Sequence, residues 1–308
     1  VDEELHEHGL AHFLEHVLFK GTKRRSALQV INRLERVGGD VNAYTSKEYT
    51  FLYATFLREH FQRAAELLSD MLFHSVFPDR ELQKEKDVVI DEIESYRDTP
   101  EEAIYDEFEE KAFARQAIGR NILGTPDSVR AFTPGLVQGF VDKHYQAGNM
   151  VLISAGDITE GQWQKYMERY FSEPKPAVPR QDVREDSSYM PFRERLQRGT
   201  HQAHVVLGTR AYPYNHSNRR IFALINSLLG GGGLTSRLNL SLREKHGYSY
   251  QVDSNYAPYT GTGLFSIYFG TDRSRVKKSL DLVYKELRRL KQHPLGKQQL
   301  QDAKKQMK

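Results

Sequence analysis

Two histidines and a glutamate stand within five consecutive residues near the start of the sequence. The stretch HFLEH places His12 and His16 four residues apart, with Glu15 directly before His16. Residues four apart share one face of a helix, so both imidazoles can bind the same ion. Zinc prefers such nitrogen ligands, and a neighbouring carboxylate can take a proton from a water that the metal makes acidic. The pattern therefore predicts a hydrolytic metal site.

Spacing alone leaves other interpretations open. His8 stands four residues before His12, and an ordinary helix can carry surface histidines at this interval in a chain that has 12 of them. A third ligand is also required, and the stretch EKDVVIDEIESY offers Glu85 and Glu92, two turns apart on one helical face. Three carboxylates nearby compete with Glu92 for this role: Glu81, Asp91 and Glu94.

The elements that must hold these residues are predicted from hydrophobic periodicity and from cap and turn residues. Helices are expected at 9–19, at 26–37 with a Ser26 cap, and at 60–77, 79–98 and 101–114. A strand pair with a turn at Ser46–Lys47 is expected within 41–57, and a buried strand at 149–158. Helices and strands alternate without a βαβ rhythm, which predicts an α+β fold.

An internal repeat indicates two related domains. A helix end, a glycine, two strands and a helix follow Leu34, and the same order follows Leu242. The second copy has INSLLGGGGLTSRL where the first has AHFLEHVLFKGT, so it lacks the His and Glu side chains. We therefore expect a metal-bearing domain at 1–175, a proline-rich linker at 176–198 and a second, incomplete domain at 199–308.

Composition narrows the classes of partner. The 308 residues carry a net charge of +3 with acidic and basic residues nearly balanced, so we expect no nucleic-acid partner. The absence of cysteine excludes disulfides, thiolate zinc sites and cysteine nucleophiles. No apolar run reaches the roughly 18 residues of a membrane helix, so we expect no membrane partner.

Six stretches resemble the pitrilysin-type inverted zinc peptidases, the HxxEH family that includes bacterial processing proteases and mitochondrial processing peptidase. They occur in the family's order and run through nearly the whole chain: GLAHFLEHVLFKGT, GGDVNAYTSKEYTFLYA, EKDVVIDEI, ILGTPDSVRAFT, HYQAGNMVLISAGDI and LREKHGYSYQV. The resemblance implies two homologous α+β domains that face each other around a cavity. It also implies that elements before the motif helix and beyond Lys308 are missing from this sequence.

The resemblance also implies roles for individual residues. It implies one Zn²⁺ per chain on His12, His16 and Glu92, because 76 positions separate His16 from Glu92, as in the family's third ligand. It makes Glu15 the general base and gives Glu85 a supporting role beside the ligands.

Substrate contacts are implied as well. The residues Asn42, Ala43 and Tyr44 correspond to an edge strand to which an extended peptide adds. In the second half, Arg243 would hold the substrate backbone and Tyr250 would hydrogen-bond the developing oxyanion, with Tyr248 as the nearby tyrosine that does not align.

We therefore expect a zinc metalloendopeptidase that hydrolyses peptides or unfolded, presequence-like polypeptides. Its expected partner is the peptide substrate, and the resemblance leaves room for a homodimer or a paralogous partner subunit. The alternative is a catalytically inactive family partner or peptide-binding scaffold, against which the intact His-Glu-His set with Glu92 argues.

Overall fold

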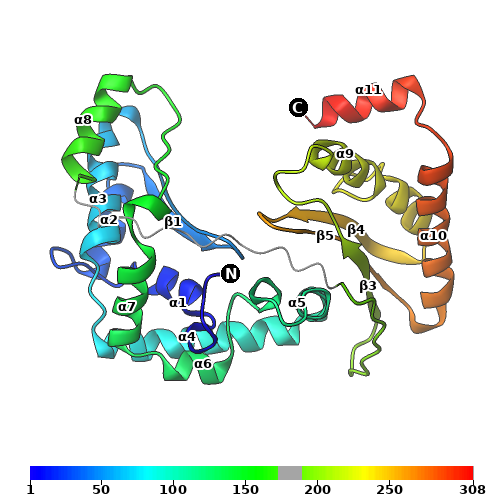
Figure 1. Cartoon of the computed structure of the whole chain (residues 1–308), viewed down its shortest axis with the longest axis horizontal. Helices are drawn as coiled ribbons and strands as arrows, with labels where there is room; N and C mark the ends of the chain where they lie inside the picture. Colours follow the sequence, from blue (N-terminus) through cyan, green and yellow to red (C-terminus); the bar gives the residue numbers. More distant parts are fainter. Residues whose placement is uncertain (173–188, 308) are drawn as a thin grey trace. The chain divides into compact units, whose positions relative to one another are not determined.

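The structure, a computed structural model, describes residues 1–172 and 189–307, which form two compact units (Figure 1). Unit 1 contains residues 1–95 and 120–172, and unit 2 contains residues 96–119 and 189–307. Both units mix helices with antiparallel strands, which confirms the α+β fold class. Among the described residues, no helix is both long enough and apolar enough to span a bilayer.

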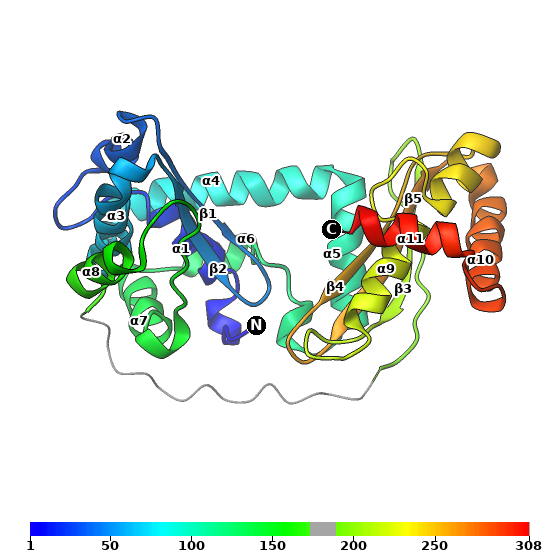
Figure 2. The same cartoon turned by 90° about the horizontal axis from the view of Figure 1, so that it is seen from above.

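Unit 1 is mostly helical around one strand pair. Its principal elements are α1 (Leu10–Val17), α2 (Ala27–Glu35), β1 (Asp40–Thr45), β2 (Thr50–Thr55), α3 (Phe61–His74), α4 (Asp79–Asp98), α6 (Pro126–Ala131), α7 (Pro134–His144) and α8 (Glu160–Tyr170). Figure 2 shows α4 as a long helix that leads into α5 (Pro100–Ala112) of unit 2. Ser26 and Gln29 form a capping box at the start of α2, as the sequence predicts.

The helix α1 starts at a position that only glycine can occupy. Gly9 has φ +88°, and a Cβ atom there would lie 2.7 Å from the Cα of Gly124. The Glu3 carboxylate accepts hydrogen bonds from the backbone N–H groups of Gly9 and Ala11, at 3.0 and 2.7 Å. An acidic group at this end also complements the helix dipole. These contacts fix the direction of the first turn of α1.

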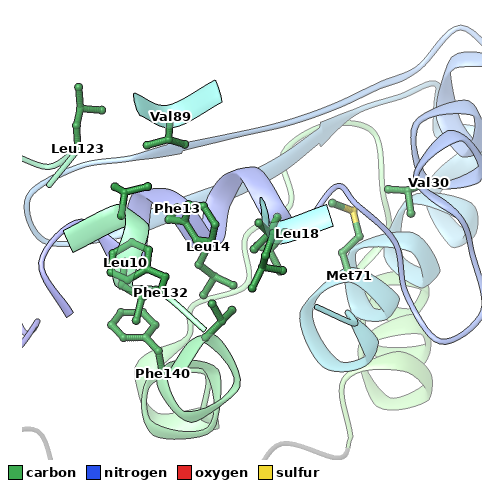
Figure 3. Packing of buried hydrophobic residues seen from close by; sticks show 14 of the residues in the cluster. Leu10, Phe13, Leu14, Leu18, Val30, Met71, Val89, Leu123, Phe132 and Phe140 are labelled. Carbon is green, nitrogen blue, oxygen red and sulfur yellow. The ribbon is translucent and has the colours of Figure 1, made fainter. Parts of the chain in front are cut away.

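The apolar side of α1 is the centre of the unit 1 core. Leu10, Phe13, Leu14 and Val17 are completely buried, and Figure 3 shows several of them among side chains from other elements of the unit. These include Met71 of α3, Val89 of α4, Phe132 after α6 and Phe140 of α7. Burying each such side chain contributes roughly 1.5–3 kcal/mol. The core therefore holds α1 and α4 in a fixed relation.

The strand pair of unit 1 packs its inward face on that core. β1 and β2 pair antiparallel, with Val41 opposite Ala54 and Ala43 opposite Leu52. Val41, Leu52 and Ala54 pack against the core cluster. Side chains alternate between the two faces of a strand, so the intervening residues, Tyr44 among them, lie on the opposite face.

The strand predicted at 149–158 is wrong. Residues 150–157 take no regular secondary structure, and Val151 and Ile153 are 82% and 77% exposed. A strand needs a neighbour that supplies ladder hydrogen bonds. In the described part of the chain, the unit 1 strands β1 and β2 pair only with each other, so this apolar segment does not take part in their ladder.

Unit 2 is built on a three-stranded antiparallel sheet of order β3-β5-β4. Its principal elements are α5, β3 (Ala203–Arg210), α9 (Arg219–Leu229), a π-helical segment η5 (Asn239–Lys245), β4 (Ser249–Pro258), β5 (Gly263–Thr271), α10 (Val276–Gln292) and α11 (Lys297–Gln306). The two strands predicted after Leu242 are β4 and β5, and α10 follows them, which is the element order of β1, β2 and α3 in unit 1.

Helices cover both faces of this sheet. On one face, Phe265, Ile267 and Phe269 of β5 form a core with side chains of α9 and α10. On the other face, Leu264 packs with α5 and the residues after it, including Phe113. Every residue of β5 is buried as a result.

The helix α5 departs from the predicted domain boundary, which assigned all of 1–175 to the first domain. The Tyr105 hydroxyl donates a hydrogen bond to the Asp253 carboxylate on β4 at 2.8 Å. A Cβ atom on Gly208 of β3 would lie 2.9 Å from the Phe108 ring, so the glycine allows α5 to approach. Residues 96–119 therefore belong to unit 2. Most of the predicted linker lies outside the described residues.

Candidate metal centre

The histidines of α1 and one glutamate of α4 converge in unit 1. The Nε2 atoms of His12 and His16 are 3.3 Å apart. The Glu92 Oε2 atom lies 3.7 Å from His12 Nε2 and 3.5 Å from His16 Nε2. Among the described residues, this is the one set of three His, Cys, Asp or Glu side chains that is close enough to hold a metal ion.

These distances fit tetrahedral zinc. Zinc binds imidazole nitrogen and carboxylate oxygen at about 2.0–2.2 Å, so two ligand atoms on a tetrahedron lie about 3.4 Å apart. The three measured separations, 3.3, 3.5 and 3.7 Å, all lie close to that value. Two imidazoles with one carboxylate are also a donor set that catalytic zinc sites use, with a fourth position left for water or substrate. The residues present therefore fit the metal.

Burial and neighbouring charges shift the pKa values of the two histidines in opposite directions. His12 is only 7% exposed, and this burial together with the nearby His16 lowers the pKa of His12 to about 4. His12 is therefore neutral at pH 7, which is the form that binds metals. Burial also acts to lower the pKa of His16, but the hydrogen bond with Glu85 and the charge of Glu92 outweigh it and raise that pKa.

Glu85 contacts His16 at Nδ1, the ring nitrogen that does not face His12 and Glu92. One oxygen of its buried carboxylate lies 3.0 Å from His16 Nδ1, and the other lies 2.6 Å from Lys20 Nζ. Burial acts to raise the pKa of Glu85, but these two partners outweigh it and lower the pKa. A carboxylate on the outer nitrogen of a ligand histidine fixes the ring orientation and its tautomer. Lys20 neutralises the buried charge of Glu85, a contact that the sequence did not reveal.

The carboxylates of Glu15 and Glu92 are close enough for their charges to interact. Burial raises the pKa of Glu92, and the charge of Glu15 raises it further. A cation between the ligands would relieve this repulsion. Glu15 itself accepts a 2.6 Å hydrogen bond from the Thr45 hydroxyl, at the end of β1. Burial, and after it the charge of Glu15, also raises the pKa of Tyr145.

β1 leaves one edge open beside the site. Within the described residues, β1 pairs only with β2. The Ala43 N–H donates to the side-chain oxygen of its neighbour Asn42 at 2.8 Å and so is occupied by a side chain of its own strand. Tyr44 is 45% exposed, and its ring contacts those of three neighbouring aromatic residues: Tyr49, Phe51 and Tyr53. An extended peptide can pair with such an edge.

The residues predicted in the second half form a pair within unit 2. The Arg243 guanidinium lies over the Tyr250 ring, 4.9 Å from its centre, and Tyr250 is 80% exposed. The neighbouring Tyr248 differs, because its ring contacts Arg275 and His246. Of the two tyrosines, Tyr250 is therefore the one whose side chain is available to a ligand. The roles of Arg243 and Tyr250 toward substrate stay predictions.

The structure thus brings together the five polar residues expected from the first half, His12, Glu15, His16, Glu85 and Glu92. His8 is not part of this group, and its Nε2 lies 2.8 Å from the backbone oxygen of Asn121. Lys20, Thr45 and Tyr145 were not found from the sequence. All three stand inside stretches that carry the family resemblance, which was the one available signal for them.

Comparison with known proteins identifies the family. Residues 1–126 match the family model described as Insulinase (Peptidase family M16). Residues 131–307 match the model described as Peptidase M16 inactive domain. The second match covers most of unit 2, which lacks the His-Glu-His set.

Individual relatives agree with this assignment. An uncharacterized zinc protease of Bacillus subtilis, YmxG, is 33% identical over 97% of this chain and 73% of its own length. An uncharacterized zinc protease of Rickettsia felis is 34% identical over 93% and 68%. A Helicobacter pylori protease structure superposes with a TM-score of 0.89 at 21% identity, covering 99% of this chain and 75% of that one, and so shows the fold. The chain therefore belongs to peptidase family M16, the pitrilysin-type family.

Proposed function

We propose that the protein is a zinc metalloendopeptidase that hydrolyses extended or unfolded peptides. The observation that carries this proposal is the convergence of His12, His16 and Glu92 at separations near those of a zinc tetrahedron. Relatives named as zinc proteases support it. Zinc, when bound by these three residues, supplies the Lewis acidity that polarises the peptide carbonyl and makes water a nucleophile at neutral pH.

The chain's own residues carry out the proton transfers. Glu15 takes one proton from the attacking water as the new carbon–oxygen bond forms. Glu15 then passes that proton to the amine nitrogen as the peptide carbon–nitrogen bond breaks. Its position on α1, adjacent to His16 and one turn from His12, places the carboxylate beside the ligands. Glu85 and Lys20 keep the His16 ring oriented throughout.

The edge of β1 aligns the substrate. An extended peptide that pairs with the backbone at Asn42–Tyr44 displaces the Asn42 side chain from the Ala43 N–H. Tyr250 donates a hydrogen bond to the oxyanion, and Arg243 supports the substrate backbone. Most backbone groups of a folded protein are already paired, so the proposed substrates are short or unfolded chains.

A cleavage assay with a chelator tests the proposal. The protein should cut an unstructured peptide that carries a fluorophore and a quencher. Phenanthroline should abolish cleavage, and added zinc should restore it. The main alternative, a scaffold that binds peptides through β1 without cutting them, predicts peptide binding with no cleavage under any zinc concentration. Cleavage that persists in full after zinc has been removed would contradict the proposed function.

A further inference from the structure

A second polar contact of Glu15 leads away from the metal ligands and into the β1–β2 hairpin. Thr45 is the last residue of β1 and lies directly opposite Thr50, the first residue of β2. Their hydroxyl oxygens are 3.2 Å apart. The Thr45 hydroxyl donates to Glu15 Oε2 at 2.6 Å. A hydroxyl has one proton, so Thr50 must be the donor in its bond to Thr45. The chain of donors therefore runs from Thr50 to Thr45 to Glu15.

This chain occupies one oxygen of the carboxylate and leaves the other available. The last torsion of a glutamate is broad and has no strongly preferred angle, so the carboxylate plane of Glu15 is not set by its own side chain. A hydrogen bond of 2.6 Å to a carboxylate is short and belongs to the stronger class. Thr45 and Glu15 are both half-buried, which limits competition from solvent.

We propose that Thr45 is a positioning residue for the general base, and that Thr50 supports Thr45 in this role. The inference rests on the proposed function, because it assigns a role within that reaction. Thr45 fixes the plane of the Glu15 carboxylate so that Oε1 points toward the water and the leaving amine. Thr45 directly follows the proposed docking residues Asn42–Tyr44, so a single strand sets both the substrate register and the orientation of the base.

Two variants of Thr45 separate the hydroxyl from the rest of the side chain. Thr45→Val keeps the shape and removes the donor, while Thr45→Ser keeps the donor and removes a methyl group. We expect Thr45→Val to lower kcat about 10- to 100-fold, because a misaligned catalytic group loses this much, with KM and zinc content unchanged. Thr45→Ser should retain most of the activity, and Thr50→Val should lower kcat less than Thr45→Val. Thr55→Val, at the exposed far end of β2, is the matched control.

A measurement without turnover tests the contact itself. In zinc-free protein, Thr45→Val should lower the melting temperature in the wild-type background and change it little in the Glu15→Ala background. Such a non-additive pattern is the signature of a direct interaction between two side chains. Equal shifts in both backgrounds would contradict the contact and with it the inference.

The outcomes separate this inference from the proposed function. A wild-type protein that cuts no peptide with zinc bound would overturn the proposed function and this inference together. A wild-type protein that cuts peptides, beside a Thr45→Val variant with the same kcat, would overturn this inference alone. A Thr45→Ser variant as slow as Thr45→Val would also overturn it, because the hydroxyl would then not be the group that matters.

Discussion

The two units contain the same sequence of strand, strand and helix, but they surround it differently. In unit 1, β1 and β2 form a sheet of their own, with an open edge and the exposed ring of Tyr44. In unit 2, β3 pairs with the far side of β5, and helices on both faces bury β5 completely. In unit 2 only the central strand β5 is thus paired on both sides, whereas β1, β2, β3 and β4 each have one strand neighbour among the described residues.

The helices that accompany the hairpins differ in the same sense. α1 presents His12, Glu15 and His16 beside its buried apolar side. The corresponding stretch of unit 2, in and after α9, has no His or Glu in those places. The comparison teaches that the same order of strand, strand and helix occurs with the polar set of α1 in unit 1, and without it in unit 2, where a third strand pairs with β5.

The largest effect is expected from Glu15, the proposed general base, which has no counterpart in unit 2. Glu15→Gln should lower the rate of peptide cleavage by about 10²–10⁴-fold while zinc remains bound, since the amide cannot accept the proton. Cleavage kinetics with metal analysis of the same sample would measure this. Glu35→Gln, an exposed change at the end of α2, is the control. A Glu15→Gln variant with normal kcat would contradict the role of Glu15 as the base that distinguishes unit 1 from unit 2.

The next effect tests whether unit 2 takes part in the chemistry. Tyr250→Phe should lower kcat about 10²-fold and leave KM nearly unchanged, as expected when one oxyanion donor is lost. Tyr248→Phe is the matched control, because that ring packs against Arg275 and His246. If both variants behaved alike in kinetic assays, unit 2 would be limited to a structural role.

A third variant sharpens the role of the residues behind the metal ligands. Glu85→Gln should weaken zinc binding about 10- to 100-fold, because the His16 ring loses its charged partner and Lys20 is left uncompensated. Competition with a metal-sensitive dye would give the affinity. Glu81→Gln, on the same helix and paired only with Lys84 among the ion pairs of the described residues, should leave the zinc affinity unchanged. Equal affinities for both variants would rule out this support.

The smallest effect concerns the open edge of β1. Ala43→Pro removes an N–H that bonds to the Asn42 side chain, so the ladder to β2 keeps its hydrogen bonds. We expect KM to rise about fivefold, the value of one hydrogen bond of about 1 kcal/mol, with zinc content unchanged. Steady-state kinetics with an extended peptide would measure the change. An unaltered KM would mean that substrate does not pair with this edge.

The sequence predicted the polar site better than its surroundings. The helical period places His12 and His16 on one face of α1, and Glu85 and Glu92 on one face of α4. The structure brings these two faces together. Both glutamates contact His16, so spacing within α4 could not distinguish the ligand from its support; the family pattern was needed for that choice. Thr45 could not be found, because its contact depends on how the hairpin packs against α1.

Errors arose where a segment's environment decides its structure. The apolar residues at 150–157 read as a buried strand, yet strand formation requires a pairing partner that the sequence of the segment does not reveal. The assignment of 96–119 to the first domain failed for a similar reason. The attachment of α5 to the second sheet depends on contacts with residues about 150 positions away, such as the hydrogen bond from Tyr105 to Asp253.

The central claim is that His12, His16 and Glu92 hold a zinc ion, and a zinc titration of the metal-free protein tests it most directly. Calorimetry should show about one tight zinc site per chain in the wild-type protein and its loss in both His16→Ala and Glu92→Ala. Circular dichroism would confirm that the variants remain folded. Folded variants that still bind one zinc with wild-type affinity would contradict the account, because the metal would then reside elsewhere.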